Sequence, residues 1–434
     1  MLEKIGAASV GDLFTTIPQP FQLNRALNVP ESLCEMELQQ HIIELARRNA
    51  SADDAVCFLG GGSYDHFIPS VVDVVASRSE FYTAYTPYQA EASQGSLQAF
   101  FEYQTLIAQI TGLDVSNASL YEGGSAVAES VLMAISINLD RSKVVIAESV
   151  HPEYRLTLST YLANLNKQIV TVPTPGGAID PAELAKVVDD QTLCVIVQHP
   201  NFFGNLEAVD AVSSLCKAKG ALFVSSIDAI SLGILKRPGQ YGADIAVGEG
   251  QCLGTAMQFG GPYLGLMACR DEFVRKIPGR IVGQTTDRNG KRCWVLTLQT
   301  REQHIRREKA TSNICTNQGL FALRASVYLA ALGPQGLRET ANLCLQKAHY
   351  LADELCKIPG VSLKFKQPFF KEFTVQVPGD APALLAKLLK AGYHGGLALG
   401  RWYATLGNCV TIAVTEKRTR AELDGFVAAF RASV

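Results

Sequence analysis

The sequence predicts an α/β fold with a mainly parallel sheet, followed by a smaller α+β region. Short apolar runs alternate with helical patterns from about Gly60 to Lys309. Several of these runs are β-branched and apolar on both faces, which is typical of parallel strands covered by helices on both sides. After about Gly319 the pattern changes to that of a compact unit with a largely antiparallel sheet. The 434 residues exceed what one small core accommodates, so we expect more than one domain.

The first part of the chain, residues 1–60, is expected to form an extended and helical arm. Phe14 to Pro30 carries three prolines and is predicted to be extended. Glu31 to Asn49 is predicted to be helical. Such a segment has little core of its own, so we expect it to lie across another part of the protein or across a partner subunit.

Residues 61–318 are expected to form the large domain. Its predicted strands are Val144 to Ala147, Ile169 to Val172, Cys194 to Val197, Leu222 to Val224, Ile245 to Val247 and Leu264 to Met267. One intervening helix has clear start signals, because Asp180 can cap it, Pro181 occupies its first position and Glu183 has capping-box-like spacing. The order strand, helix, strand predicts right-handed crossovers in a parallel sheet.

Residues 319–434 are expected to form the small C-terminal domain. Apolar residues recur every three or four positions from Leu337 to Leu355, which predicts a long helix that stops at Pro359-Gly360. The last helix is predicted to open with a capping box of Thr419 and Glu422. The other predicted elements are the strands Val361 to Lys366, Phe373 to Val377 and Val410 to Val414 and the helix Ala381 to Lys390.

The composition excludes several classes of protein. The net charge of -2 gives no field for nucleic acid or an acidic membrane, and no apolar run approaches the ~18 residues that a membrane span needs. The eleven cysteines form no Cys-x-x-Cys pair and do not cluster with histidines, so we expect no metal site. Most of them lie in apolar stretches, as small core residues in a reducing compartment do. Without a signal pattern at the N-terminus, we expect a cytoplasmic location.

Two groups with possible binding roles lie near predicted strand ends. Gly123, Gly124 and Ser125 precede an apolar helix, whose N-terminus offers free amides and a positive dipole end to a phosphate. The alternative is an ordinary glycine turn with Ser125 as a cap. His151 follows a strand at the edge where ligands of α/β sheets bind, so its ring could stack on a flat cofactor. The alternative is a histidine bonded to backbone in a loop.

Two further groups reach the same predicted edge. Asn201 could hydrogen-bond a ring substituent, or simply form a Pro-Asn turn. Asp228 ends a buried strand and could pair with the pyridinium nitrogen of pyridoxal phosphate (PLP). A Schiff-base lysine would then follow the next strand, but residues 244–254 contain none, and no lysine occurs between Lys236 and Lys276. Without that amine the chain is not expected to run PLP chemistry alone.

An aromatic segment from Phe81 to Glu91 precedes a helix that is predicted to start near Gly95. Tyrosine rings together with a carboxylate suit an interface or the rim of a pocket. A surface loop anchored by two or three buried rings is an equally good interpretation. Tyr85, Tyr88 and Glu91 carry the groups that would form such an interface or rim.

Five segments resemble the glycine decarboxylase P-protein family. They are Phe58 to His66, Tyr82 to Gly95, Asn117 to Gly123, Gln198 to Gly204 and Glu249 to Gln251. The resemblance runs over nearly the whole chain. Some organisms make one long P-protein with two related halves, and others split it into two subunits. The length of this chain resembles that of subunit 1, the equivalent of the N-terminal half.

This resemblance implies the aspartate-aminotransferase-like fold of PLP enzymes (fold type I). It implies a PLP-dependent oxidoreductase complex of glycine catabolism, which decarboxylates glycine and passes the aminomethyl group to the lipoyl arm of H-protein. It also implies a heterotetramer with two copies of each subunit, in which subunit 2 holds the PLP lysine. This chain would then support the active site of subunit 2 and be inactive and colourless by itself.

Three other functions stay open on the sequence alone. The chain could be an independent PLP enzyme, with Lys236 or Lys276 as the lysines nearest in sequence to the expected position. It could be a structural or regulatory partner that adds nothing to turnover. It could also be a docking module for the lipoyl domain. If subunit 2 holds PLP, the PLP-type pocket of this chain would be vestigial. Its residues would be Gly123, Gly124, Ser125, His151, Asn201 and Asp228.

Overall fold

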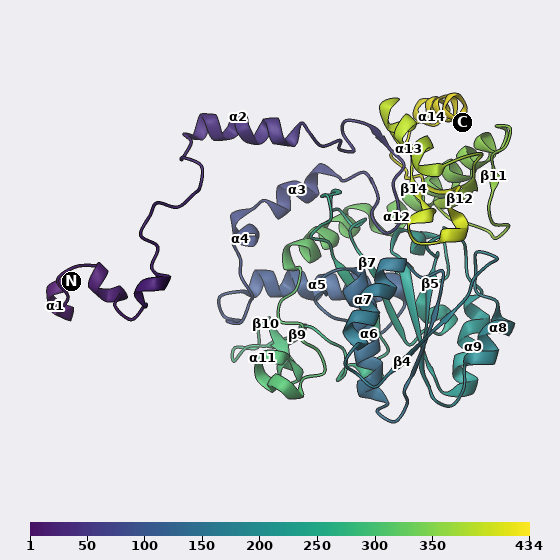
Figure 1. Cartoon of the computed structure of the whole chain (residues 1–434). Coiled ribbons are helices and arrows are strands. Elements are labelled where there is room, and N and C mark those ends of the chain that lie inside the picture. The colour runs from purple at the N-terminus through teal and green to yellow at the C-terminus, as the bar shows by residue number, and fades with distance from the viewer. The chain divides into compact units, whose positions relative to one another are not determined.

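The computed structural model describes all 434 residues, which divide into two compact units, 1–51 and 52–434. The first unit contains two α-helices, α1 (Leu2–Ile5) and α2 (Glu35–Ala46), and two short 3-10 helices, Gly11–Phe14 and Gln19–Phe21 (Figure 1). Helix α2 lies within the segment predicted to be helical, and its first turn is closed by Glu37, which accepts a hydrogen bond from the Cys34 amide. None of the residues of this unit is buried.

The second unit is built around a seven-stranded sheet with the order β2-β8-β7-β6-β5-β3-β4. Its strands are β2 (Val115–Ser116), β3 (Lys143–Ala147), β4 (Gln168–Val172), β5 (Thr192–His199), β6 (Leu222–Asp228), β7 (Ile245–Glu249) and β8 (Gly265–Cys269). Only β8 runs against its neighbours. The mainly parallel sheet is therefore confirmed, and each of the six predicted runs overlaps one of the strands β3 to β8.

Helices cover both faces of this sheet. The α-helices of this part are α3 (Ser70–Ala76), α4 (Ser79–Tyr82), α5 (Gln94–Thr111), α6 (Gly123–Ile137), α7 (Pro152–Leu162), α8 (Pro181–Val187), α9 (Val209–Lys219) and α10 (Pro238–Tyr241). Figure 1 shows α6 and α7 on one side and α8 and α9 on the other, as right-handed crossovers require. Asp180 caps α8 as predicted, but Glu183 pairs with Lys186 and forms no capping box.

The chain then passes through a hairpin to one long helix. The hairpin strands are β9 (Ile281–Thr286) and β10 (Arg292–Thr297), and the short helix α11 (Gln303–Arg306) follows. Helix α12 (Gly319–Leu355) begins well before the predicted helical segment and is kinked at Gly333, directly before Pro334. Its first half packs into the large-domain core and its second half into the core of the C-terminal part, so it joins the two cores.

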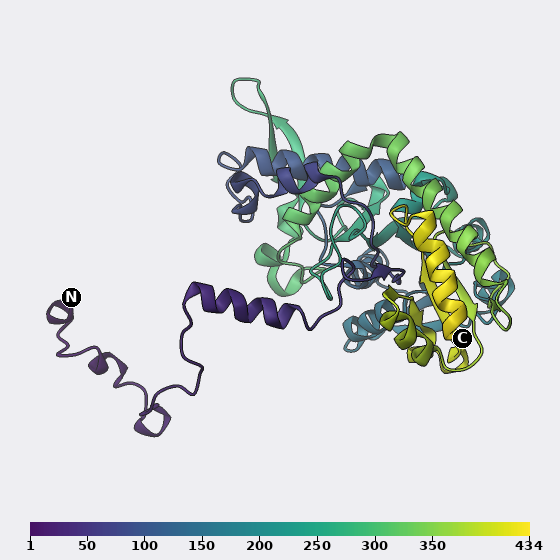
Figure 2. The same cartoon turned by 90° about the horizontal axis from the view of Figure 1, so that it is seen from above.

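The C-terminal part has a four-stranded antiparallel sheet, as predicted, with the order β11-β12-β15-β14. Its elements are β11 (Ser362–Leu363), β12 (Glu372–Gln376), α13 (Ala381–Lys390), β13 (Tyr393–His394), β14 (Leu397–Ala398), β15 (Cys409–Ala413) and α14 (Arg420–Ser433). Strand β13 pairs in parallel with β1 (Val56–Cys57). The capping box of Thr419 and Glu422 at the start of α14 is confirmed. Figure 2 shows α12 and α14 side by side from above.

All eleven cysteines are free thiols. Five of them, placed in apolar stretches by the sequence, are buried: Cys194, Cys216, Cys269, Cys344 and Cys409. This agrees with their interpretation as small core residues. No helix of the structure combines the length and the apolar character needed to cross a lipid bilayer.

Replacing Glu129 on α6 by Gln is expected to stabilise the protein in a pH-dependent way. Glu129 is buried, one carboxylate oxygen has no hydrogen-bond partner, and burial raises its pKa to about 7 from an ordinary 4.5. Below pH 4.5 both states hold the proton, but as the pH rises to about 7 only the unfolded chain ionises freely, so the wild type loses stability. We expect E129Q to gain on the order of 3 kcal/mol over wild type at pH 8 and little at pH 4.5.

Denaturant unfolding across this pH range measures the effect. The matched control is E102Q, which changes an exposed glutamate on α5. A pH-dependent gain of equal size in E102Q would contradict the assignment to Glu129.

Candidate functional site

The end of β6 carries a buried ion pair. Asp228 accepts a hydrogen bond from the Ile230 amide at 2.9 Å, and its other carboxylate oxygen lies 2.6 Å from Nζ of Lys371. Lys371 directly precedes β12, so it reaches the pocket from the C-terminal antiparallel sheet. The segment after the next strand, residues 244–254, contains no lysine, and Lys371 reaches Asp228 from far along the chain, where no local sequence signal marks it.

Lys371 is almost completely enclosed, with 1 % of its side chain exposed. Its ammonium lies 3.5 Å from the centroid of the Tyr64 ring and 3.0 Å from Nε2 of His66. Burial lowers the pKa of Lys371, but its neighbours, with the charge of Asp228 foremost, together outweigh burial and raise the pKa. The pair is therefore an ammonium and a carboxylate, with an aromatic face as additional support for the cation.

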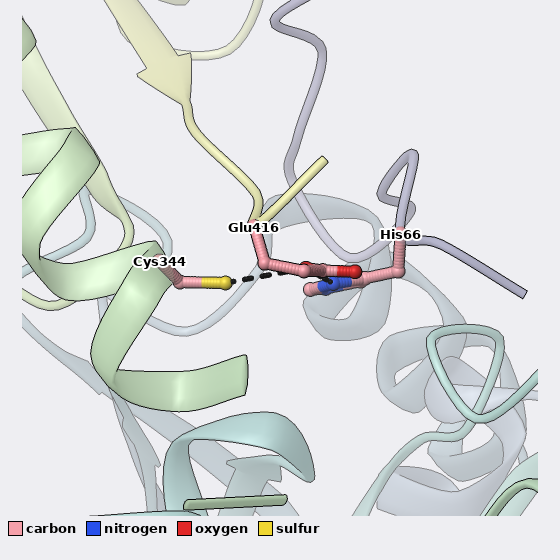
Figure 3. Close-up of side chains that lie close together, drawn as sticks. All are labelled: His66, Cys344 and Glu416. Carbon is pink, nitrogen blue, oxygen red and sulfur yellow. Dashed lines mark hydrogen bonds and ion pairs between the residues drawn. The ribbon is translucent and has the colours of Figure 1, made fainter. Parts of the chain in front are cut away.

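Beyond Lys371, the contacts continue through His66, Glu416 and Cys344 (Figure 3). Nδ1 of His66 lies 2.6 Å from Oε2 of Glu416, and Sγ of Cys344 lies 3.5 Å from the same oxygen. Although burial favours the neutral acid, the contacts with His66 and with the Phe67 amide lower the pKa of Glu416 to about 2. Glu416 therefore carries a negative charge in this buried row.

These three side chains resemble a metal-ligand set in composition only. The Lys371 ammonium can only donate, so Nε2 of His66 accepts, and its Nδ1–H points at Glu416. The nitrogen that faces the cluster thus has no free lone pair. Burial also raises the pKa of the Cys344 thiol well above its usual value, which opposes the thiolate that a metal requires. The cluster is a hydrogen-bonded row whose donors and acceptors are already paired with one another.

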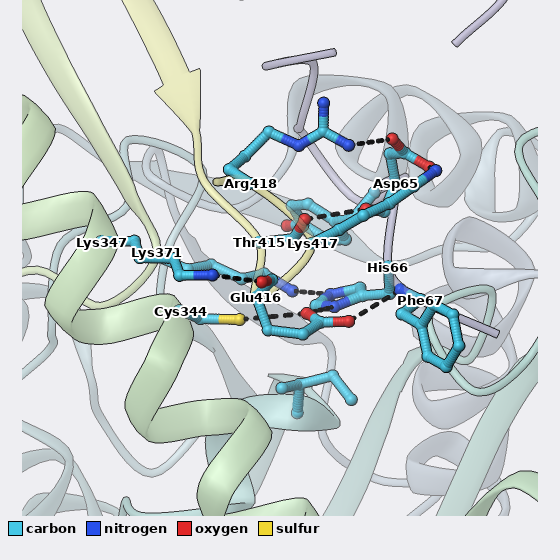
Figure 4. Close-up of polar contacts among 12 residues, drawn as sticks. Asp65, His66, Phe67, Cys344, Lys347, Lys371, Thr415, Glu416, Lys417 and Arg418 are labelled. Carbon is cyan, nitrogen blue, oxygen red and sulfur yellow. Dashed lines mark hydrogen bonds and ion pairs between the residues drawn. The ribbon is translucent and has the colours of Figure 1, made fainter. Parts of the chain in front are cut away.

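A wider set of ion pairs holds this row in place (Figure 4). Asp65 accepts from Lys417 and Arg418, each at 2.8 Å, and Lys347 donates to the backbone oxygen of Glu416. Two segments far apart in the sequence, 65–67 and 415–418, are thereby fixed against each other and against α12.

The predicted phosphate cradle at the start of α6 is occupied by the chain itself. The Gly123 amide donates to Oε2 of Glu249 at 2.9 Å, and the Glu122 side chain caps the Ser125 amide. The other oxygen of Glu249 accepts from the amides of Gln251 and Leu264, each at 2.9 Å. Burial raises the pKa of Glu249 to about 8, while the three amides favour its carboxylate form.

Gly124 and His151 lie beside this cradle. A Cβ at Gly124 would come within 3.4 Å of the Glu122, Thr157 and Tyr154 side chains, so the cradle is tightly packed. Nε2 of His151 donates to the Gly61 carbonyl at 2.8 Å, and Nδ1 accepts from the Glu153 amide at 3.1 Å. Burial lowers the pKa of His151 to about 4, so the ring is neutral. It stacks on Tyr154, with 4.4 Å between the centroids and 17° between the planes.

Asn201 is turned into the loop that follows β5. Its amide nitrogen donates to the Gly177 carbonyl and to Glu207, and its oxygen accepts from the Phe203 amide at 3.0 Å. All of its polar atoms are thus engaged by a buried turn, and it does not line the pocket at Asp228.

The space that remains at this sheet edge is about 20 Å³. That is room for about one water molecule, whereas small-molecule sites enclose roughly 300 Å³ or more. Tyr154, Lys371 and Glu372 fill the volume between Asp228 and the start of α6. PLP does not fit among these residues, and residues 244–254 supply no lysine for it.

Tyr85, Tyr88 and Glu91 lie elsewhere, on the exposed loop before α5. Tyr85 is 82 % exposed and Tyr88 is 48 % exposed. The Tyr88 hydroxyl accepts from the guanidinium of Arg280 at 3.1 Å. Arg280 is fully buried and forms no ion pair, so its positive charge stands uncompensated beneath this loop. A groove of about 280 Å³ runs beside Tyr85 toward the start of α12.

Comparison with protein families gives one match to nearly the whole chain. Residues 1–430 match the family described as the glycine cleavage system P-protein. The chain is 52 % identical over 427 residues to the probable glycine dehydrogenase (decarboxylating) subunit 1 of Carboxydothermus hydrogenoformans, covering 98 % of this chain and 96 % of that one. It is 51 % identical over 428 residues to the protein of the same description from Prosthecochloris aestuarii, again covering 98 % and 96 %.

Solved structures agree with these matches. The inhibitor-bound crystal structure of a glycine cleavage system glycine decarboxylase (P-protein) superposes with a TM-score of 0.93 at 44 % identity, covering 100 % of this chain and 97 % of that one. The sphingosine-1-phosphate lyase of Burkholderia pseudomallei has a TM-score of 0.68 at 13 % identity, covering 96 % and 94 %. This second likeness shows the fold alone, which is that of fold type I PLP enzymes.

Replacing Gly204 by Ala is expected to disrupt the contact between this pocket and the small domain. Gly204 has φ of +88°, and an added Cβ would lie 2.0 Å from the backbone oxygen of Glu372. The matched control is Gly379, which has φ of +85° and open space around it. We expect G379A to cost about 1 kcal/mol of unfolding free energy through backbone strain, and G204A at least about 3 kcal/mol through strain plus collision. Equal losses in denaturant unfolding would show that the close approach has no energetic weight.

Proposed function

Because the chain belongs to the glycine cleavage system P-protein family, in which it is a subunit 1 of glycine dehydrogenase (decarboxylating), we propose that it completes an active site whose PLP is held by a partner subunit. The observation that carries the proposal is the ion pair of Lys371 and Asp228. Its ammonium lies against the carboxylate that would pair with the ring nitrogen if this chain held the cofactor. With the pocket of this chain filled, the cofactor chemistry belongs to subunit 2.

In this proposal the assembled enzyme decarboxylates glycine and transfers the aminomethyl group to the oxidised lipoyl arm of H-protein, releasing CO2. PLP supplies the electron sink for that decarboxylation on subunit 2. This chain provides one wall of the site and does not hold the cofactor covalently. The proposed assembly contains two copies of each subunit, and a cytoplasmic location is part of the proposal.

The loop with Tyr85, Tyr88 and Glu91 is the surface that we assign to the site of the partner. Its support is chemical, because two exposed rings and an exposed carboxylate project from a loop anchored by Arg280. Because the guanidinium of Arg280 has no acidic partner, it favours an anionic group above the loop, such as a substrate carboxylate or a phosphate. Tyr82 is also exposed and lines the same groove as Tyr85, which agrees with a surface that a partner covers.

An independent PLP enzyme is disfavoured by the positions of its two candidate lysines. Lys236 forms an exposed ion pair with Asp210, and Lys276 donates to the backbone oxygen of Ser136. Neither lines the pocket at Asp228. A structural or regulatory partner and a lipoyl-docking module are outcomes that the first experiment below distinguishes.

Co-expression with subunit 2 is expected to give a complex that exchanges glycine carboxyl with bicarbonate, while this chain alone is colourless and inactive. Light scattering should report two copies of each subunit. The complex should contain one PLP for each pair of this chain and subunit 2. Full exchange activity of subunit 2 alone would support the structural or regulatory role. Binding of H-protein to this isolated chain alone would favour the docking role.

Within the assembled complex, Tyr88→Phe and Glu91→Gln are each expected to lower kcat/KM for glycine by about tenfold or more, because each removes a polar group that faces the site of the partner. The matched control is Glu102→Gln, which neutralises an exposed glutamate on α5 outside this loop. Exchange kinetics on complexes of verified stoichiometry measure the effect. Wild-type turnover from both variants would refute the assignment of this loop.

A further inference from the structure

We propose that this chain has replaced PLP piece by piece with its own side chains, so that its pocket rejects the cofactor altogether. Lys371 takes the place of the pyridinium, Glu249 that of the phosphate, and Tyr154 that of the ring. This goes beyond the proposed function, which requires only that the Schiff-base lysine be absent.

The first replacement concerns charge. Asp228 at the end of a parallel strand would serve a pyridinium N–H by offering a carboxylate oxygen. Here the ammonium of Lys371 lies 2.6 Å from that oxygen and is 1 % exposed. The amine is therefore at the ring-nitrogen position and cannot serve as the Schiff-base amine of a cofactor whose nitrogen faces Asp228.

The second replacement concerns the anion. The N-terminus of the 15-residue helix α6 attracts a negative group through its free amides and its dipole. Glu249 places a carboxyl oxygen 2.9 Å from the Gly123 amide and accepts the hydrogen bond that a phosphate would accept there. Burial raises the pKa of Glu249 to about 8, so it takes over the acceptor role of a phosphate without its full charge. Its other oxygen is held by two more amides, so the group is fixed in place.

The third replacement concerns the aromatic ring. His151 presents its face to the pocket, where a flat cofactor would stack. Tyr154 occupies that face, nearly parallel to it at 4.4 Å. A Cβ added at Gly123 would lie 2.4 Å from the Tyr154 hydroxyl, so this ring also reaches the start of α6.

The replacing groups also connect the two domains. Lys371 and Glu372 come from the small-domain strand segment, while Asp228 belongs to the large sheet. Glu372 accepts from the Gly61 amide at 2.7 Å and from the Tyr64 hydroxyl at 2.8 Å. The domain arrangement around this pocket is thus held by permanent side chains and does not depend on a ligand.

A binding measurement separates this proposal from simple loss of the lysine. Ring-nitrogen, stacking and phosphate contacts do not need the lysine, so a pocket that lacked only the lysine would still bind the cofactor non-covalently. The probe is pyridoxamine 5′-phosphate, whose amine cannot form a Schiff base with surface lysines. In equilibrium dialysis of the full chain we expect no retained probe. Retention of one equivalent with a Kd of about 10 μM or below would overturn the proposal.

The outcome is independent of the proposed function, because the dialysis reads this chain alone and the exchange assay reads the complex. A second test examines the ion pair in the full chain by thermal unfolding. K371M and D228N each leave a buried charge unpaired, so we expect each to lower Tm by about 5 °C. The double variant D228N/K371M removes both charges, so its decrease in Tm should be much smaller than the sum of the two single decreases.

The matched control is the exposed pair of Lys236 and Asp210. The cycle of K236M and D210N should show no resolvable coupling. Additive losses at Lys371 and Asp228, or coupling no larger than in the control, would overturn the role of Lys371 as the internal cation. If either K371M or D228N does not fold, the double variant can still be compared with the single variant that does fold. A higher Tm of the double variant would show that removing the second charge restores stability.

Discussion

The buried ion pair of Asp228 and Lys371 is the interaction on which the organisation of this subunit depends. An isolated carboxylate at the end of a buried strand would carry a large desolvation cost. In this chain the cation is a lysine from the C-terminal part, supported by the Tyr64 ring and by His66. Removing either partner would leave a buried charge, so the sheet edge and β12 are energetically coupled.

The network around that pair converts a ligand site into a structural junction. The row from Lys371 through His66 to Glu416 joins segments that are hundreds of positions apart in sequence. Glu249 and Tyr154 satisfy the helix terminus and the histidine face that would otherwise need an external group. The surface that we propose for the partner is formed by different residues, on the loop before α5.

The sequence predicted the fold more completely than the site, for a physical reason. Strands β3 to β8 are continuous apolar runs because both faces are buried, and that signal is local. The first half of α12 escaped prediction because Gly333 and Pro334 break the pattern where two cores meet. Lys371 could not be found at all, because its pairing with Asp228 is a tertiary contact between distant segments. Glu183 shows the same limit on a small scale, since its spacing suits a capping box but Lys186 competes for it.

The filled pocket also bears on how reversible the specialisation of this subunit is. A duplicated enzyme that had lost only one lysine could regain catalysis by a single substitution. Here Lys371, Glu249 and Tyr154 each block a different contact, and each is tied to its own partners. Reverting any one of these residues alone would leave a buried charge without a partner or create a cavity, and it would not restore a binding site. If PLP is held by the partner as proposed, single reversions in this chain would be expected to lose stability before they regain binding, so the division of labour between the two subunits would be hard to reverse.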